Sequence, residues 1–331
     1  MLNPRPLDFN PPKPLRHPDV QNLLSSLGLR AGFLRRRTRE LEQHTHDCIL
    51  DGGNGIRLSG ELSLPRKHSG IQDNDKLVVL FHGWEGSSQS AYMVSAALSL
   101  FEAGYTVFRL NLRDHGNSHH LNEGLFNSTL LDEVLAAIAD IQKRWQHRQT
   151  YLAGFSLGAN FALRIAIKAG AAGLSLKQVA AICPVMDPAH TLRALEDARF
   201  FYEAYFVRKW RHSLLKKLDF YPHYNYRQEL LALKDLRSMH EFFVPRFTPY
   251  PNPDAYFNAY ALDNNQLNQI TLPTTIISSQ DDPITKVDGL PSINNNRFLT
   301  IQTPRYGSHC AFLQDYRLTS WLDEQLINLF D

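Results

Sequence analysis

A serine flanked by glycines is the residue in this chain whose surroundings point most clearly to chemistry. The segment Gly154-Phe155-Ser156-Leu157-Gly158 follows the apolar run 149–153 and opens a stretch of helical character, 157–168. A strand that turns sharply into a helix, with glycine on both sides of the turn, exposes the serine hydroxyl at the end of a sheet. Such a hydroxyl attacks carbonyl groups when a nearby base accepts its proton. The pattern therefore predicts Ser156 as a catalytic nucleophile.

A suitable acid and base occur later in the chain. Asp282 closely follows the apolar run 274–279, and His309 lies in a polar loop after the run 297–302. A histidine accepts the serine proton when a carboxylate fixes its tautomer and stabilises its charge. Loops at the carboxyl ends of parallel strands meet at one edge of a sheet. The order Ser156, Asp282, His309 therefore predicts a triad for acyl transfer.

Two other carboxylates compete with Asp282 for the role of the acid. Asp281 is its direct neighbour, and Asp187 follows the apolar run 178–184. We favour Asp282 because an Asp-Pro step starts a turn that should present its carboxylate. The alternative role for His309 is that of a loop histidine bonded only to backbone.

An acyl-transfer site also needs N–H groups that stabilise the developing oxyanion. We expect one from the amide of Leu157 and the second from Trp84, in the glycine-containing loop 82–87 that follows the apolar run 76–81. Glycine lets backbone approach a substrate closely. The Trp84 indole either lines the acyl pocket or simply packs. His82 is expected to form structural hydrogen bonds rather than to act as a second base.

Other polar residues are expected to have structural roles. Asp114 and His115 follow the apolar run 105–110 and should fix the loop there rather than catalyse. The histidine pairs 44/46 and 119/120, and the pair His309 and Cys310, lack further ligands at zinc-like spacing. No glycine-rich phosphate-binding motif is present. We therefore expect neither a metal nor an organic cofactor.

The elements that must position these residues alternate between strands and helices. Strands are predicted at 48–50, 57–64, 76–81, 105–110, 149–155, 178–184, 274–279 and 297–302, and helices at 90–103, 129–145, 157–169 and 315–330. This alternation is typical of an α/β fold whose mostly parallel sheet carries helices on both faces. The aromatic-rich segment 188–265 has no strand pattern and is predicted to be a helical cap. The core would comprise 47–187 and 266–331.

Residues 1–46 are predicted to form an N-terminal arm packed on this core. Prolines between positions 4 and 18 argue against regular structure at its start. Five arginines at positions 30, 35, 36, 37 and 39 favour a solvated surface over contact with phosphate or anionic lipid. The cap carries a similar basic stretch: Arg208, Lys209, Arg211, Lys216 and Lys217. A solvated face is favoured there too, although a membrane-facing lid would use the same charges.

The amino-acid composition limits the classes of partner and the cell compartment that we expect for this protein. The chain has 331 residues, a net charge of +2 and 43% hydrophobic residues, which suits a large core and gives no reason to expect nucleic-acid binding. The three cysteines cannot form a paired framework. Together with the lack of a signal peptide or a membrane-spanning run, they predict a cytoplasmic protein. Nothing in the composition indicates an oligomeric state.

Taken together, these segments resemble the α/β hydrolase superfamily, and more narrowly its YheT-like branch. The matching segments are Pro11-Pro12, Arg16-His17-Pro18-Asp19-Val20-Gln21, His82-Gly83-Trp84-Glu85-Gly86-Ser87, Gly154 to Asn160, Asp281-Asp282-Pro283, Phe243 to Thr248 and Ala255-Tyr256-Phe257. The resemblance implies hydrolysis of carboxylic esters, with short or medium acyl chains or lipid-like substrates, by Ser156, Asp282 and His309. The alternatives are acyl transfer, thioester or amide hydrolysis on the same triad, and a non-catalytic binding protein.

Overall fold

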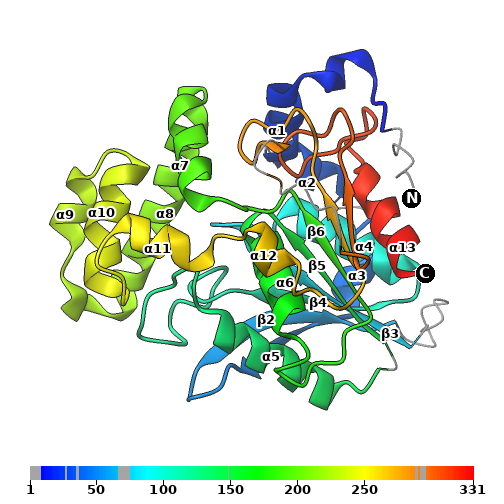
Figure 1. Ribbon diagram of the computed structural model, residues 1–331, viewed down its shortest axis with the longest axis horizontal. Coiled ribbons are helices and arrows are strands. Elements are labelled where there is room, and N and C mark those ends of the chain that lie inside the picture. The colour runs from blue at the N-terminus through cyan, green and yellow to red at the C-terminus, as the bar shows by residue number, and fades with distance from the viewer. Residues whose placement is uncertain are drawn as a thin grey trace.

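An eight-stranded β-sheet runs through the part of the chain that the computed structural model describes, namely residues 9–331 except 27, 35–36, 66–74, 148, 288–289 and 291–295 (Figure 1). Its strands are β1 (Thr45–Asp51), β2 (Arg57–Ser63), β3 (Lys76–Phe81), β4 (Thr106–Asn111), β5 (Gln149–Phe155), β6 (Gln178–Ile182), β7 (Thr274–Ile277) and β8 (Leu299–Gln302). Their order is β1-β2-β4-β3-β5-β6-β7-β8. Only β2 runs antiparallel to its neighbours, so the described sheet is mostly parallel.

Helices cover both faces of this sheet. On one face, α5 (Leu131–Arg144) and α6 (Leu157–Lys168) pack against strand side chains in one apolar cluster. On the other face, α4 (Ala91–Glu102) and α13 (Trp321–Phe330) belong to a second cluster. Strands covered on both sides are apolar over most of their length, as β3 is after Lys76 in its sequence KLVVLF. The predicted fold class is therefore confirmed.

A group of helices is inserted between β6 and β7. They are α7 (Pro188–Asp197), α8 (Phe200–Phe220), the short 3-10 helix η2 (Pro222–Tyr224), α9 (Arg227–Ala232), α10 (Leu236–Phe247), α11 (Pro253–Tyr260) and α12 (Asn264–Leu267). Figure 1 shows α7 to α11 gathered to one side of the sheet, and we call these helices the cap. Ring-to-ring contacts fill the interior of the cap, for example between Tyr226 and Phe243, whose centroids are 5.0 Å apart.

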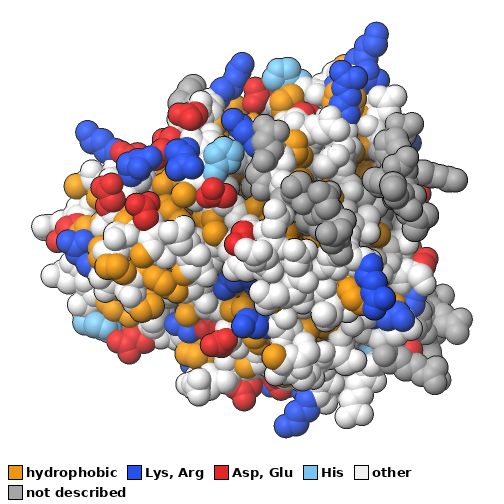
Figure 2. Space-filling model, in the orientation of Figure 1, with side chains coloured by type: hydrophobic (Ala, Val, Ile, Leu, Met, Phe, Trp, Pro, Cys, Tyr) orange, Lys and Arg blue, Asp and Glu red, His pale blue; other side chains and the backbone are white. Residues whose placement is uncertain are grey.

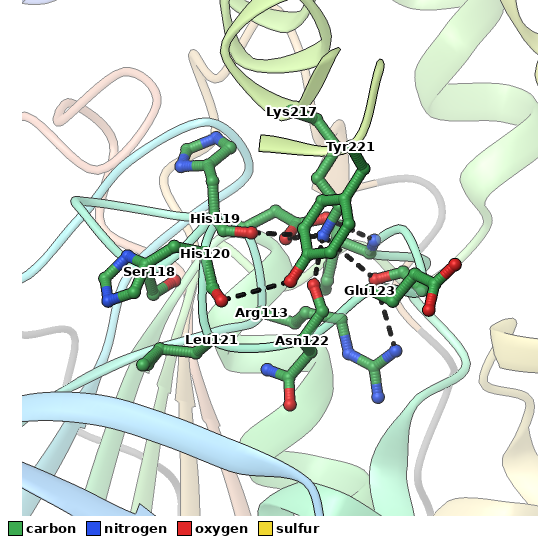
Figure 3. A network of polar contacts seen from close by, with 12 residues as sticks. Arg113, Ser118, His119, His120, Leu121, Asn122, Glu123, Lys217 and Tyr221 are labelled. Carbon is green, nitrogen blue, oxygen red and sulfur yellow. Dashed lines mark hydrogen bonds and ion pairs between the residues drawn. The ribbon is translucent and has the colours of Figure 1, made fainter. Parts of the chain in front are cut away.

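One lysine fastens the cap to the core. The Lys217 side chain on α8 is 1% exposed and points into the loop after β4 (Figure 3). Its Nζ donates to Asp114 Oδ1 at 2.7 Å and to the Asn122 carbonyl at 2.6 Å, with longer bonds of 3.3 Å to the carbonyls of His119 and Gly124. Asp114 adopts φ 58°, a left-handed conformation that favours glycine. The pair fixes α8 against this loop.

The basic stretch of the cap is therefore not one solvated face, and that expectation is wrong for Lys217. Lys217 is buried because it pairs with Asp114, whereas Arg208 and Lys209 are exposed. On the face drawn in Figure 2, basic and acidic side chains are interspersed over the cap rather than separated by sign. No helix within the described ranges is both long and apolar enough to cross a membrane.

The first part of the chain is more regular than expected. A 3-10 helix, η1 (Lys13–Arg16), precedes α1 (Pro18–Ser26), α2 (Gly28–Leu34) and α3 (Arg39–Gln43). Pro18 opens α1 because the first position of a helix tolerates proline. The expectation of a solvated arginine cluster is wrong for Arg30, which is 1% exposed, while Arg35 and Arg36 lie outside the described residues.

The closing helix begins later than predicted. It was expected from residue 315, but α13 begins at Trp321. Before it, Leu313 and Ser320 form an isolated β-bridge. The Asp315 carboxylate accepts hydrogen bonds from the amide and hydroxyl of Thr319. These local bonds hold a turn where the residue pattern alone suggested helix.

Candidate active site

Ser156 occupies a strained turn between β5 and α6. Its backbone has φ 55° and ψ −116°, which is uncommon for a residue with a side chain. A Cβ atom added to Gly154 would lie 2.2 Å from the Gly158 carbonyl oxygen. One added to Gly158 would lie 2.5 Å from the carbonyl oxygens of Phe81 and His82. Both positions flanking the serine therefore require glycine, because neighbouring backbone passes too close for any side chain.

Three of the predicted site residues come together at the carboxyl edge of the sheet. His309 Nε2 lies 2.9 Å from Ser156 Oγ, and His309 Nδ1 lies 2.9 Å from Asp282 Oδ2. With its Nδ1–H donating to the carboxylate, the imidazole presents Nε2 as the acceptor of the serine hydroxyl. The Asp282 side chain is fully buried, and that of His309 is 12% exposed. The arrangement is a continuous serine–imidazole–carboxylate relay.

The pair of His309 and Asp282 stabilises its own charge separation. Burial alone would lower the pKa of His309, but the adjacent Asp282 carboxylate outweighs burial and raises the pKa to about 9. At pH 7 the resting imidazole is therefore mostly protonated, and it is the neutral fraction of His309 that accepts the serine proton. Burial alone would raise the pKa of Asp282, but His309 and hydrogen bonds from Thr285 and the Ile284 amide keep that pKa below its ordinary value. The carboxylate is thus held ionised behind the imidazole.

The competing carboxylates have other partners. Asp281 Oδ1 accepts the Ser308 amide at 2.8 Å, and burial raises the pKa of this carboxyl. Asp187 accepts the His190 amide at 2.9 Å and caps the N-terminus of α7. Of the three candidate acids, Asp282 is the one that bonds to His309.

The two amides expected to face an oxyanion lie beside Ser156. A Cβ atom on Gly83 would lie 3.2 Å from the Ser156 Cβ, so the loop after β3 passes directly along the serine. The Gly83 amide donates to the Tyr92 hydroxyl, and the Glu85 amide donates to His115 Nε2. Between them, the Trp84 amide has no acceptor among the described residues. The Leu157 amide also lacks one there, because it opens α6.

Two buried histidines fix the loops around this site. His82 Nδ1 donates to the Gly83 carbonyl at 2.7 Å, and its Nε2 accepts the Leu112 amide at 3.1 Å. His115 Nδ1 donates to the Arg113 carbonyl at 2.7 Å while its Nε2 accepts the Glu85 amide. Burial lowers the pKa of both rings, which keeps them neutral. They join the loops after β3 and β4 by hydrogen bonds, as expected.

Sequence reasoning missed the part that α1 plays at the site. Asn22 Oδ1 accepts the His309 amide at 3.2 Å, and Asn22 Nδ2 donates to the Tyr202 hydroxyl of the cap at 2.8 Å. Gln21 bonds to both the amide and the carbonyl of Leu313. Helix α1 therefore holds the histidine loop and the cap together. The sequence signal for this contact was the segment Arg16 to Gln21. It resembles the YheT-like branch, but the sequence alone assigned it no role.

A cavity of about 360 Å³ opens beside Ser156, between the core and the cap. Trp84 lines it while its indole stacks on Phe206, with ring centroids 5.4 Å apart, so the indole both packs and forms the wall. Burial lowers the pKa of His240 in this wall to about 4 and raises that of Glu85 to about 8. Both side chains are predominantly neutral at pH 7. These two side chains therefore add no charge to the cavity wall, which Asp114, Lys209 and Lys217 also line.

One cluster has the composition of a metal site. Cys183, His309 and Cys310 each offer a ligand atom, and these three atoms lie within 4.8 Å of one another. Sequence spacing gave His309 and Cys310 no third ligand, but the fold brings Cys183 beside them from the end of β6. No cluster with three such ligands forms around the pairs 44/46 or 119/120 in the described ranges.

Two proteins of known sequence are similar to this chain over about three quarters of its length. The YheT protein of Escherichia coli is 24% identical over 261 residues, which cover 75% of this chain and 74% of that protein. The medium-chain fatty acid ethyl ester synthase/esterase 2 of Saccharomyces cerevisiae is 26% identical over 283 residues, which cover 77% of this chain and 61% of that protein. The chain thus spans less than two thirds of the yeast protein.

Solved structures show the same fold. An esterase of Pyrococcus furiosus superimposes with a TM-score of 0.56 at 15% identity, covering 88% of this chain and 94% of that one. Est1E of Butyrivibrio proteoclasticus superimposes with a TM-score of 0.52 at 16% identity, covering 86% of this chain and 98% of that one. The family model described as alpha/beta hydrolase fold matches residues 76–313, which is most of the chain. This protein therefore belongs to the α/β hydrolase fold family.

Proposed function

We propose that this protein hydrolyses carboxylic esters through an acyl-enzyme formed on Ser156, with His309 as the base and Asp282 as the acid. The observation that carries the proposal is the relay of two 2.9 Å contacts from Ser156 through His309 to Asp282. A non-catalytic protein has no need for a serine held in a strained turn against a buried imidazole–carboxylate pair.

The proposed reaction uses the relay twice. Ser156 Oγ attacks the ester carbonyl while His309 Nε2 accepts the hydroxyl proton of the serine. The resulting oxyanion accepts hydrogen bonds from the amides of Trp84 and Leu157. The C–O bond to the alcohol breaks as His309 returns the proton to the leaving oxygen. His309 then takes a proton from water while the water oxygen attacks the acyl carbon. The bond from the acyl carbon to Ser156 Oγ breaks as His309 returns that proton to Ser156 Oγ, and the carboxylic acid leaves.

The cavity supports an apolar acyl group as the part of the substrate that is recognised. Its aromatic wall removes hydrocarbon from water, which is worth about 0.8 kcal/mol per buried CH₂ group. The yeast relative described above is named for medium-chain fatty acid ethyl esters, and a second yeast protein, 21% identical over 309 residues, is named monoacylglycerol lipase. We therefore propose esters of medium-chain acids as substrates, with a small or glycerol-like alcohol.

A panel of p-nitrophenyl esters of increasing acyl length tests this function. We expect kcat/KM to rise with chain length and then to fall once the acyl group exceeds the cavity. Ser156→Ala should lower kcat by at least ~10³-fold with the fold retained. Hydrolysis that is equally fast in the variant would reject the assignment.

A matched amide and thioester of the preferred acid, and product analysis with added ethanol, distinguish the other reactions that the same triad supports. Acyl transfer has one specific observation in its favour, since the yeast relative is named as a synthase as well as an esterase. Ethyl ester formation that outpaces hydrolysis would assign the chain to acyl transfer instead.

A further inference from the structure

Two thiols that the proposed reaction does not use lie beside His309. Cys183 directly follows β6, and Cys310 directly follows His309 in the chain. Their Sγ atoms and a ring nitrogen of His309 lie within 4.8 Å of one another. Both cysteines are free and buried, and Cys310 also borders the substrate cavity. The cavity therefore gives solutes a route to the cluster.

The backbone directs both thiols into this position. Cys183 has φ 47° and Cys310 has φ 60°, both in the left-handed region that side chains other than glycine seldom adopt. The Cys183 Sγ lies 3.7 Å from the Ser308 carbonyl, and the Cys310 Sγ lies 3.7 Å from the Ile182 carbonyl. Each thiol thus reaches across to the segment that carries the other. Strained residues of this kind gather at functional sites.

Two thiolates and one imidazole are a ligand set that Zn²⁺ accepts, with a fourth position left for water or substrate. Around a tetrahedral zinc ion the ligand atoms stand about 3.4–3.8 Å apart, given the usual Zn–S and Zn–N bond lengths. The three atoms here, which lie within 4.8 Å of one another, need to approach by at most about 1.4 Å. Small rotations of the cysteine side chains suffice for this. Two thiolates also balance the charge of the ion, which lowers the cost of burying it.

A carboxylate that would orient the metal-binding ring is already in place. A histidine that binds a metal commonly donates its other ring N–H to a carboxylate, which orients the ring. His309 Nδ1 does so with Asp282, so Nε2 is the nitrogen left for a metal ion. This is the nitrogen that contacts Ser156 Oγ at 2.9 Å. A metal ion and the serine would therefore compete for one nitrogen.

We propose that Cys183, Cys310 and His309 bind Zn²⁺ or another thiophilic divalent cation, and that the bound ion stops hydrolysis by occupying His309 Nε2. Binding releases to solvent the two thiol protons and, where His309 is protonated, the proton on its Nε2, and it involves no change in oxidation state. The inhibitory effect rests on the proposed function, whereas metal binding itself does not.

Cadmium binding tests the site without any need for activity. The reduced Ser156→Ala protein is titrated with Cd²⁺ without oxygen, and the cadmium–thiolate absorption in the ultraviolet is followed. We expect one Cd²⁺ per chain. The band should be lost in Ser156→Ala/Cys183→Ser and retained in Ser156→Ala/Cys48→Ser. Cys48 is the matched control because it lies in β1, outside the cluster. A band that is absent from Ser156→Ala, or that persists without Cys183, would overturn the site.

Inhibition is then measured on proteins that retain Ser156, each compared with its own rate without metal. Zn²⁺ should inhibit ester hydrolysis by the wild type and by Cys48→Ser at the same concentration, reversibly on adding a chelator. Half-maximal inhibition of Cys183→Ser should require a Zn²⁺ concentration that is higher by a factor of roughly 10 or more. If Cys183→Ser does not fold, Cys310→Ala replaces it. Equal sensitivity of all variants would refute inhibition through this cluster, and a cadmium site in a protein without esterase activity would refute only the proposed function.

Discussion

The buried pair of Lys217 and Asp114 makes a quantitative prediction about how the cap is held. Lys217→Met keeps the length and apolar stem of the side chain but removes the ammonium group. The change leaves the Asp114 carboxylate buried without a counter-charge, and it leaves the carbonyl of Asn122 without its 2.6 Å donor (Figure 3). An uncompensated charge in the interior is strongly destabilising.

The size of the effect follows from the burial of both partners. Lys217 is 1% exposed and Asp114 is 6% exposed. Burial raises the pKa of Asp114 and lowers that of Lys217, so desolvation outweighs the attraction between the two groups. The pair is consequently no more stabilising than well-packed apolar side chains would be. Breaking it by removing one partner should nevertheless cost about 3–5 kcal/mol.

Urea unfolding followed by tryptophan fluorescence measures this cost. Trp210 of α8 contacts Trp84 of the core with ring centroids 5.3 Å apart, so the signal reports on docking of the cap. Lys216→Met is the matched control, because this neighbour is only half-buried and bonds to Asn117 at the surface. The control should cost below about 1 kcal/mol.

A second variant separates the charge from the packing. Adding Asp114→Asn to Lys217→Met removes the orphaned carboxylate, and asparagine tolerates the left-handed backbone at this position. Part of the lost stability should therefore return in the double variant. Equal losses in Lys217→Met and Lys216→Met, or no recovery in the double variant, would refute the reasoning.

Three further substitutions probe the site and its support. Asp282→Asn should lower kcat for ester hydrolysis by roughly 10³–10⁴-fold, whereas Asp281→Asn should cost far less, and comparable losses would contradict the choice of acid. Asn22→Ala removes the acceptor of the His309 amide and should lower kcat about 10-fold with KM unchanged, the equivalent of one buried hydrogen bond; a pure KM effect would argue against it. Gly158→Ala should lower stability in thermal unfolding by about 1–3 kcal/mol, because its Cβ would meet backbone oxygens at 2.5 Å. Gly170→Ala, with open space around the glycine, should not.

The core of the fold was predictable because its signals are local. Strands β3 and β5 were predicted with the bounds that the structure gives them, since buried parallel strands are apolar over most of their length. The proximity of Ser156, Asp282 and His309 was predictable because each follows a strand of one sheet, so that it follows from the topology. The turn before α13 was missed because side-chain bonds from Asp315 replace a helical turn there.

The contacts that were not predicted join segments far apart in the chain. Asn22 meets His309, and Lys217 meets Asp114, through docking of whole helices whose angles no local pattern encodes. Cys183 reaches its neighbours because β6 ends beside the histidine loop. Each of these polar groups looked like an ordinary surface or core residue in the sequence. Their partners became visible only once the helices and loops were packed.

Covalent labelling by a fluorophosphonate tests the central claim most directly. The reagent phosphonylates a serine hydroxyl that a neighbouring base activates, and mass spectrometry of the intact and digested protein locates the adduct. We predict one adduct per chain, on Ser156, absent from Ser156→Ala and much slower to form in Asp282→Asn. A folded wild-type protein that stays unlabelled, or that carries its adduct on another residue, would contradict the proposed relay.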